Sequence, residues 1–160
     1  MQKSSRGFSL IELLIVVAII LIIAAIAIPN LLRSRIAANQ ASAVSSCRTL
    51  NTAEVTYSST FNSGFCESLA YLGPPAAGAN PTSTAAGLID SVLMMGTKSG
   101  YSFTYSSGAS DSGGRINDYA ITAQPITTST GTNYYYTDQS GVIRQNSTAV
   151  AASTDSPIGG

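Results

Sequence analysis

One acidic residue, Glu12, lies inside an otherwise apolar segment, and its position suggests chemistry. Residues 13–28 are all Leu, Ile, Val or Ala, and over residues 8–28 only Ser9 and Glu12 are not apolar. A carboxylate in such a segment costs a few kcal/mol unless it is protonated or paired, so it is a functional candidate by default. The alternative is a carboxylate at a lipid headgroup boundary that is simply tolerated there.

The rest of the chain offers few groups for catalysis. It contains no His, which removes Ser-His-Asp and Cys-His catalysis and every His-based metal site. An enzyme would need a Ser–Lys pair or paired carboxylates, and Lys98 is the only lysine beyond residue 7. Eight basic and eight acidic residues give no net charge, which argues against a nucleic-acid binder. We therefore expect no enzyme, no cofactor, no metal and no specific nucleic-acid partner.

The apolar segment is long enough to cross a membrane. As a helix, residues 8–28 reach roughly 31 Å, about the thickness of a bilayer core. Three interpretations are open: an ordinary anchor, a signal peptide cleaved near residues 25–27, or a segment with a use after insertion. The run exceeds the usual length of about 7–15 apolar residues in a signal peptide, and Glu12 has no need to be in one.

Residues 7–12 read Gly-Phe-Ser-Leu-Ile-Glu, and the apolar run then continues to Pro29. Over residues 6–32 the chain resembles the amino-terminal segment of type IV prepilins and their pseudopilin relatives. The resemblance implies a leader, residues 1–7, cleavage after Gly7, N-methylation of Phe8 and an assembly role for Glu12. Many family members carry a Gly midway along the apolar run, where this chain has Leu21-Ile22.

Pairing of opposite charges gives a physical reason for the cleavage and for the position of Glu12. Cleavage exposes an α-amino group of pKa about 8, which is mostly charged at neutral pH. In a filament packed from these helices, this cation and the Glu12 carboxylate of an adjacent subunit neutralise each other. Leaving either charge alone in the core costs about 3–5 kcal/mol, so the pair enforces register between subunits.

The resemblance also implies partners and a location. The chain is expected to form a helical filament of identical subunits and to be processed by a prepilin peptidase/N-methyltransferase. An inner-membrane assembly platform with a separate ATPase would supply the work. The precursor would be a single-pass protein in the lipid bilayer of the inner membrane, and the product a periplasmic or extracellular filament on the cell surface.

The expected function is a type IV pilus subunit serving adhesion, motility or DNA uptake. The alternative is the major pseudopilin of a type II secretion system. A more distant alternative is a single-pass, membrane-anchored periplasmic protein or enzyme.

The sequence predicts one helix from Phe8 to about Ser59. Pro29 should bend it, and Gly64 should stop it. Beyond Pro29 one apolar stripe has helical spacing; it consists of Ile36, Ala43, Cys47, Leu50, Tyr57 and Phe61. In an exported protein, Cys47 and Cys66 predict one disulfide, and two buried thiols are the alternative.

The remaining residues predict an α+β fold, in which a small antiparallel β-sheet head covers the second half of the long helix. Residues 85–95 are expected to hold a short helix and residues 146–160 to fray. Strands are expected at residues 101–105, 119–123, 132–137 and 142–145. Asp111, Asp118 and Asp138 are expected in turns rather than in a calcium site, because their spacing is not that of a calcium loop. The predicted domains are the leader 1–7, a transmembrane and polymerisation half 8–29, and a pilin-like head 30–160.

Overall fold

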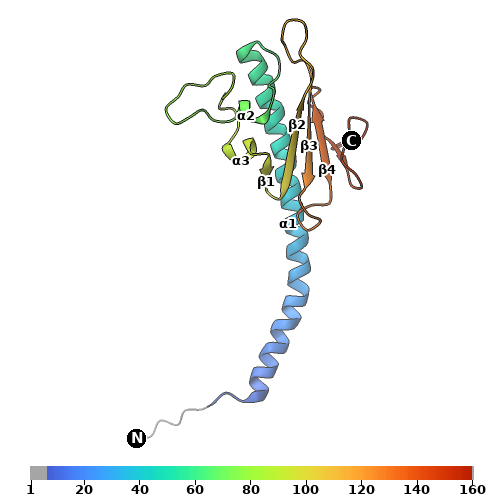
Figure 1. The fold of residues 1–160 in the computed structure, drawn as a ribbon. Coiled ribbons are helices and arrows are strands. Elements are labelled where there is room, and N and C mark those ends of the chain that lie inside the picture. The colour runs from blue at the N-terminus through green and yellow to red at the C-terminus, as the bar shows by residue number, and fades with distance from the viewer. Residues whose placement is uncertain (1–6, 160) are drawn as a thin grey trace. The chain divides into compact units, whose positions relative to one another are not determined.

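A computed structural model describes residues 7–159, so the predicted leader lies outside the described residues except for Gly7. The chain divides into two compact units, Met1–Arg35 and Ile36–Gly160. A helix, α1 (Leu10–Phe61), begins in the first unit and ends in the second (Figure 1). The predicted long helix is therefore confirmed, with ends within two residues of those expected.

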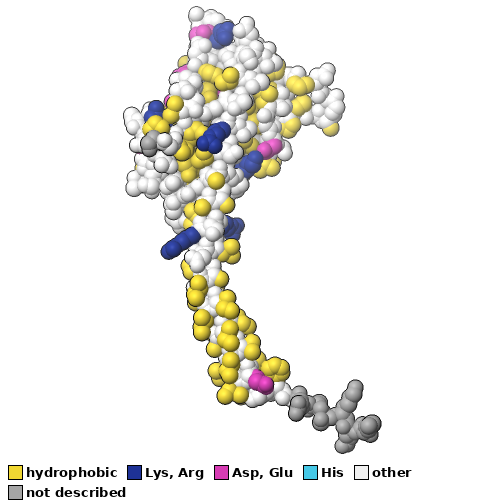
Figure 2. Space-filling view, turned by 180° about the vertical axis from the view of Figure 1, so that it is seen from behind, with side chains coloured by type: hydrophobic (Ala, Val, Ile, Leu, Met, Phe, Trp, Pro, Cys, Tyr) yellow, Lys and Arg dark blue, Asp and Glu magenta, His cyan; other side chains and the backbone are white. Residues whose placement is uncertain are grey.

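In the first unit, α1 is covered by no other element of the described chain. The large apolar side chains from Leu10 to Ile28 are between 46% (Val17) and 79% (Leu10) exposed. Hydrophobic side chains accordingly make up the surface of this part of the helix (Figure 2). By length and composition, this helix is apolar enough to cross a membrane. Such a surface requires lipid or other protein to cover it.

The second unit consists of the remainder of α1, two short helices and a sheet (Figure 1). The short helices are α2 (Leu69–Leu72) and α3 (Ser91–Met94). The strands are β1 (Thr97–Lys98), β2 (Tyr101–Ser107), β3 (Tyr119–Pro125), β4 (Tyr134–Asp138), β5 (Arg144–Asn146) and β6 (Ser156–Pro157). They form one sheet in sequence order, with every neighbouring pair antiparallel. The predicted α+β class is confirmed.

One face of the sheet packs on α1 and forms the core of this unit. On β3, Tyr119, Ile121 and Ala123 alternate with less buried residues, as expected of a half-buried strand. The buried α1 side chains include four of the predicted stripe residues, Ala43, Cys47, Leu50 and Tyr57. Two hydrogen bonds from α1 hold the loop between β3 and β4: Asn39 Nδ2 donates to the Thr130 carbonyl and Gln40 Nε2 to Thr132 Oγ1.

The helix predicted over residues 85–95 is wrong in length, because only Ser91–Met94 is helical. The preceding residues bond instead to the α2 segment: the Ala86 N–H donates to the Tyr71 carbonyl and the Leu88 N–H to the Leu72 carbonyl. The Ile89 N–H, which a helix beginning at residue 85 would direct to the Ala85 carbonyl, also donates to the Leu72 carbonyl, at 3.1 Å. Asp90 then begins α3 by accepting a hydrogen bond from the Leu93 N–H at 2.7 Å.

The prediction that residues 146–160 fray is also wrong for the described residues up to 159. Residues of β6 pair with β5, which extends the sheet. Arg144 Nη1 donates to the Asp155 carbonyl, and Asn146 Nδ2 donates to Asp155 Oδ1 at 3.0 Å. Ala151 is buried. The small, polar side chains of this segment predict no fixed structure, but specific tertiary hydrogen bonds hold it in place.

The structure also corrects the predicted disulfide, because Cys47 and Cys66 are both free and buried. Cys66 Sγ lies 2.8 Å from Glu54 Oε1 and 3.1 Å from the Ser68 carbonyl oxygen. Glu54 is seven residues beyond Cys47, which is about 10 Å further along the helix. A disulfide needs the two sulfur atoms about 2.05 Å apart, so Cys66 packs at the wrong level of α1.

Thiol titration without reductant checks this correction. Two thiols per chain should react after denaturation, and the same reagent at pH 8 should react at least about a hundredfold more slowly with the native chain. Burial raises the pKa of Cys47 to about 12 and also raises the pKa of Cys66, so little thiolate is present at that pH. If no thiol reacts in the denatured, unreduced chain, Cys47 and Cys66 form the predicted disulfide and the correction is wrong.

Candidate functional site: the amino-terminal segment

The peptide bond between Gly7 and Phe8 lies outside regular structure. Residues 7–9 precede α1 and are not helical, and Phe8 is 82% exposed. A Cβ added to Gly7 would meet no heavy atom within 4 Å. A peptidase binds its substrate as accessible, non-helical backbone, and this bond meets that requirement.

Glu12 lies in the first turn of α1 and binds the backbone just before the helix. The Ser9 N–H donates to Glu12 Oε2 at 2.9 Å, and the Leu13 N–H donates to the Ser9 carbonyl at 3.2 Å. This is one half of a capping box, in which an acid at the third helical position satisfies the N–H of the capping residue. The negative charge also lies at the positive end of the helix dipole. The carboxylate is thus held one residue from Phe8, whose amino group cleavage would expose.

Pro29 lies inside α1, and the helix continues through it. Proline has no N–H, so the Ala25 carbonyl, four residues earlier, loses its helical donor. Asn30 Nδ2 donates to the neighbouring Ile26 carbonyl at 3.0 Å. The bend at Pro29 stays a prediction.

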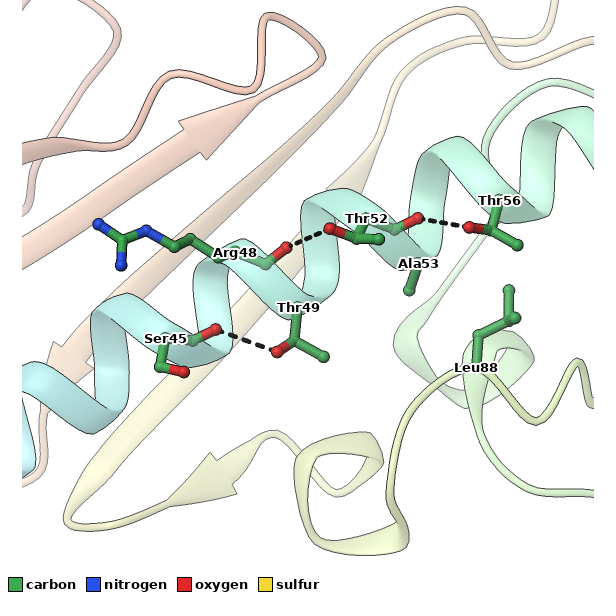
Figure 3. A pocket seen from close by; sticks show the side chains of 7 residues that line it. All are labelled: Ser45, Arg48, Thr49, Thr52, Ala53, Thr56 and Leu88. Atoms are coloured by element: carbon green, nitrogen blue, oxygen red, sulfur yellow. Dashed lines mark hydrogen bonds between the residues drawn. The ribbon is translucent and has the colours of Figure 1, made fainter.

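A separate groove lies in the second unit between α1 and Leu88 (Figure 3). Its other lining residues all come from α1: Ser45, Arg48, Thr49, Thr52, Ala53 and Thr56. The three threonine hydroxyls donate to carbonyls four residues earlier in the same helix. The lining therefore contains neither a carboxylate nor a free amine that could activate a hydroxyl, and it does not have the composition of a hydrolytic site.

Of the three aspartates expected in turns, two accept hydrogen bonds from the N–H groups of a turn and one does not. Asp111 Oδ1 accepts from the N–H groups of Gly113 and Arg115, and these bonds hold its pKa below the usual value, the Arg115 bond most strongly. Asp138 accepts from the Ser140 N–H at 2.9 Å. Both are turn residues, whereas the side chain of Asp118 makes no such bond in the described chain. Among residues 7–159 no group of three His, Cys, Asp or Glu side chains is placed to hold a metal ion.

Sequence reasoning missed two groups that the structure brings forward. Ser9 had no predicted role, although the Ser-x-x-Glu spacing of Ser9 and Glu12 is a known helix-start signal. Glu54 also had no predicted role, because the sequence does not show that this acidic side chain is fully buried.

Known proteins match this chain over its amino-terminal segment, where the candidate site lies. The family described as "Prokaryotic N-terminal methylation motif" matches residues 2–28. The type IV wide pilus major component PilA4 of Thermus thermophilus is 60% identical over 38 residues, which are 24% of this chain and 29% of that protein. The type IV major pilin protein PilA of Myxococcus xanthus is 49% identical over 53 residues, 33% of this chain and 24% of that protein. No solved structure matches.

The matches thus span less than a third of either relative's length. The described chain has a long helix that is apolar in its first half, followed by an α+β head, and the methylation motif over residues 2–28 includes the start of that helix. Over its amino-terminal segment the chain is similar to type IV pilins. An inner-membrane precursor that later joins a surface pilus fits these findings.

Proposed function

We propose that this chain is the structural subunit of a type IV pilus, assembled from the inner membrane as a filament of identical copies. The observation that carries the proposal is the methylation motif over residues 2–28, with its Gly7–Phe8 bond accessible and non-helical. Both relatives named above are pilus components, which favours the pilus over the pseudopilus of a type II secretion system.

The described residues suggest how such a subunit would work. A prepilin peptidase/N-methyltransferase would remove residues 1–7 and methylate Phe8. The apolar surface of residues 8–29 would first be solvated by lipid and then, after extraction by an assembly platform and its ATPase, be covered by the same segment of other copies. Lipid tails are as apolar as these side chains, so the transfer carries little hydrophobic cost and needs specific contacts to direct it. Glu12 supplies one, by pairing with the amino group of a neighbouring copy. The head, residues 30–160, would face the periplasm and later the cell surface.

Mass spectrometry of the amino terminus tests the processing step directly. Chain purified from sheared surface filaments should begin at N-methylated Phe8, and replacing Gly7 by leucine should leave a membrane-bound chain that begins at Met1. Replacing Ser5, also in the leader, by alanine serves as the matched control and should leave processing unchanged. Filaments whose subunits still begin at Met1, or that are trimmed beyond residue 27, would refute the proposal.

Deleting the gene separates the pilus from the secretion alternative. Loss of surface fibres with normal export of secreted proteins is expected of a pilus subunit. Loss of export with fibres intact would identify a pseudopilin instead.

A further inference from the structure

The carboxyl group of Glu54 is completely buried in the head and carries a network of contacts that the pilus role does not use. Glu54 is 0% exposed. Its Oε2 accepts a hydrogen bond from the Cys66 N–H at 3.1 Å, and its Oε1 lies 2.8 Å from Cys66 Sγ. Tyr105 on β2 donates its hydroxyl hydrogen to the Cys66 carbonyl at 2.8 Å. One residue, Cys66, is thus fixed through its N–H, its carbonyl and its sulfur.

The geometry around the sulfur indicates which group carries a proton. Cys66 Sγ lies within bonding distance of two oxygens, Glu54 Oε1 and, at 3.1 Å, the Ser68 carbonyl. A thiol has one hydrogen, so it can donate to only one of them. Both contacts are satisfied when the thiol donates to Ser68 and a protonated Glu54 donates to the sulfur, which is also a weak acceptor.

No cation faces Glu54 from the elements packed around it. The titratable groups that face it are Cys66 from the loop after α1, Tyr105 from β2 and Tyr119 from β3. On α1 itself the nearby group is Tyr57. Each of these is neutral or becomes negative, and the only ion pair in the part of the chain that the structure describes is Lys98–Asp90. Burial therefore raises the pKa of Glu54, and the hydrogen bonds from Cys66 offset only part of that effect.

We propose that Glu54 and Cys66 form a proton-dependent latch, in which the neutral Glu54 carboxyl holds residues 62–68 on α1 and its ionisation releases them. Ionisation leaves an unpaired charge in the core, next to a thiol that can then serve only one of its two oxygens. Opening of this loop hydrates the carboxylate. The hydrogen bonds from Asn39, Gln40 and Asn51 of α1 to Thr130, Thr132 and Thr137 do not involve Glu54, so opening stays local.

The direction of the pH dependence follows from the raised pKa. The latch contributes its full stability below the ordinary glutamate pKa of about 4.3 and loses it as pH rises through the folded-state value. Loop opening should therefore increase with pH.

Hydrogen exchange of the full-length chain in detergent micelles tests this. After correction for the intrinsic pH dependence of exchange, protection of the Cys66 amide should be constant at low pH and then fall about tenfold per pH unit. The Ile121 amide in β3 should keep constant protection over the same range. In Glu54→Gln, which cannot ionise, the Cys66 protection should be independent of pH between 5 and 9. Glu67→Gln, the matched control at an exposed carboxyl one residue from Cys66, should keep the wild-type slope.

Constant Cys66 protection in the wild type over this range, or the same slope in Glu54→Gln, would overturn the proposal. If Glu54→Gln does not fold, carbon-13 titration of the wild-type Glu54 carboxyl decides. A carboxyl that is already ionised at pH 5 contradicts the latch, and one that is still protonated there supports it. Neither measurement requires a filament, so the latch can fail while the pilus role stands.

Discussion

Filament yield should fall at least a hundredfold when Glu12 is replaced by glutamine or alanine, while cleavage between Gly7 and Phe8 continues. The structure places Glu12 in the first turn of α1 and its carboxylate one residue from Phe8. In the proposed filament, the amino group of a neighbouring copy would then be buried unpaired, at a cost of about 3–5 kcal/mol. That cost corresponds to a loss of about two to three and a half decades in a subunit binding constant. Sheared filaments, quantified by immunoblot against total cellular subunit, measure the yield.

Glu67→Gln is the matched control, because it removes an exposed carboxylate from the head and should leave filament yield unchanged. Mass spectrometry of the membrane fraction should find methylated Phe8 in all of these variants. Wild-type filament yield from Glu12→Gln would show that the pair has no role in assembly. A Glu12→Gln chain that still begins at Met1 would place Glu12 in peptidase recognition instead.

The amino-terminal helix is predictable because its physical cause is local. Residues 13–28 contain no helix breaker and no polar group, so hydropathy and length alone specify it. The central strands are predictable for a similar reason: along β2, and along the first six residues of β3, every second residue is more buried than its neighbours. The strands β1 and β6 have two residues each, too few to show a period of two. They exist because a neighbouring strand offers unpaired backbone groups, which a sequence pattern does not record.

Glu54 shows where residue type misleads and spacing does not. It is 0% exposed, whereas its neighbour Val55 is 64% exposed, the reverse of what hydropathy predicts. Glu54 follows Leu50 by four residues and precedes Tyr57 by three, so helical spacing places it on the buried stripe. Its burial depends on residues 62–68, which cross α1 at the level of Glu54. This crossing is a tertiary contact that helical spacing does not predict. The predicted disulfide is wrong for the same reason, since the crossing sets Cys66 against Glu54 rather than against Cys47.

Replacing Gly64 by alanine should lower the free energy of unfolding of the head by at least about 3 kcal/mol. The sequence predicts Gly64 as a helix stop, but α1 ends at Phe61 and Asn62 has the left-handed backbone, with φ of 52°. Gly64 serves a close approach instead. A Cβ there would lie 2.1 Å from the Ile116 carbonyl oxygen and 2.7 Å from the Ile116 nitrogen, and φ at Gly64 is +84°. The backbone must move, which breaks the hydrogen bond from the Phe65 N–H to the Ile116 carbonyl, 2.8 Å long.

Gly78→Ala separates the close approach from the backbone strain. Gly78 has φ of +81°, almost the value at Gly64, but no heavy atom lies within 4 Å of a Cβ built there. It should therefore cost only about 1 kcal/mol, the penalty for a left-handed alanine. Near-ultraviolet circular dichroism is the suitable signal, because the chain has no Trp and all eight tyrosines lie in residues 57–136 of the head. The melting temperature should fall by at least about 10 °C for Gly64→Ala and by a few degrees for Gly78→Ala. Equal losses in the two variants would mean that Gly64 is required only for its φ, and that the contact with Ile116 yields without cost.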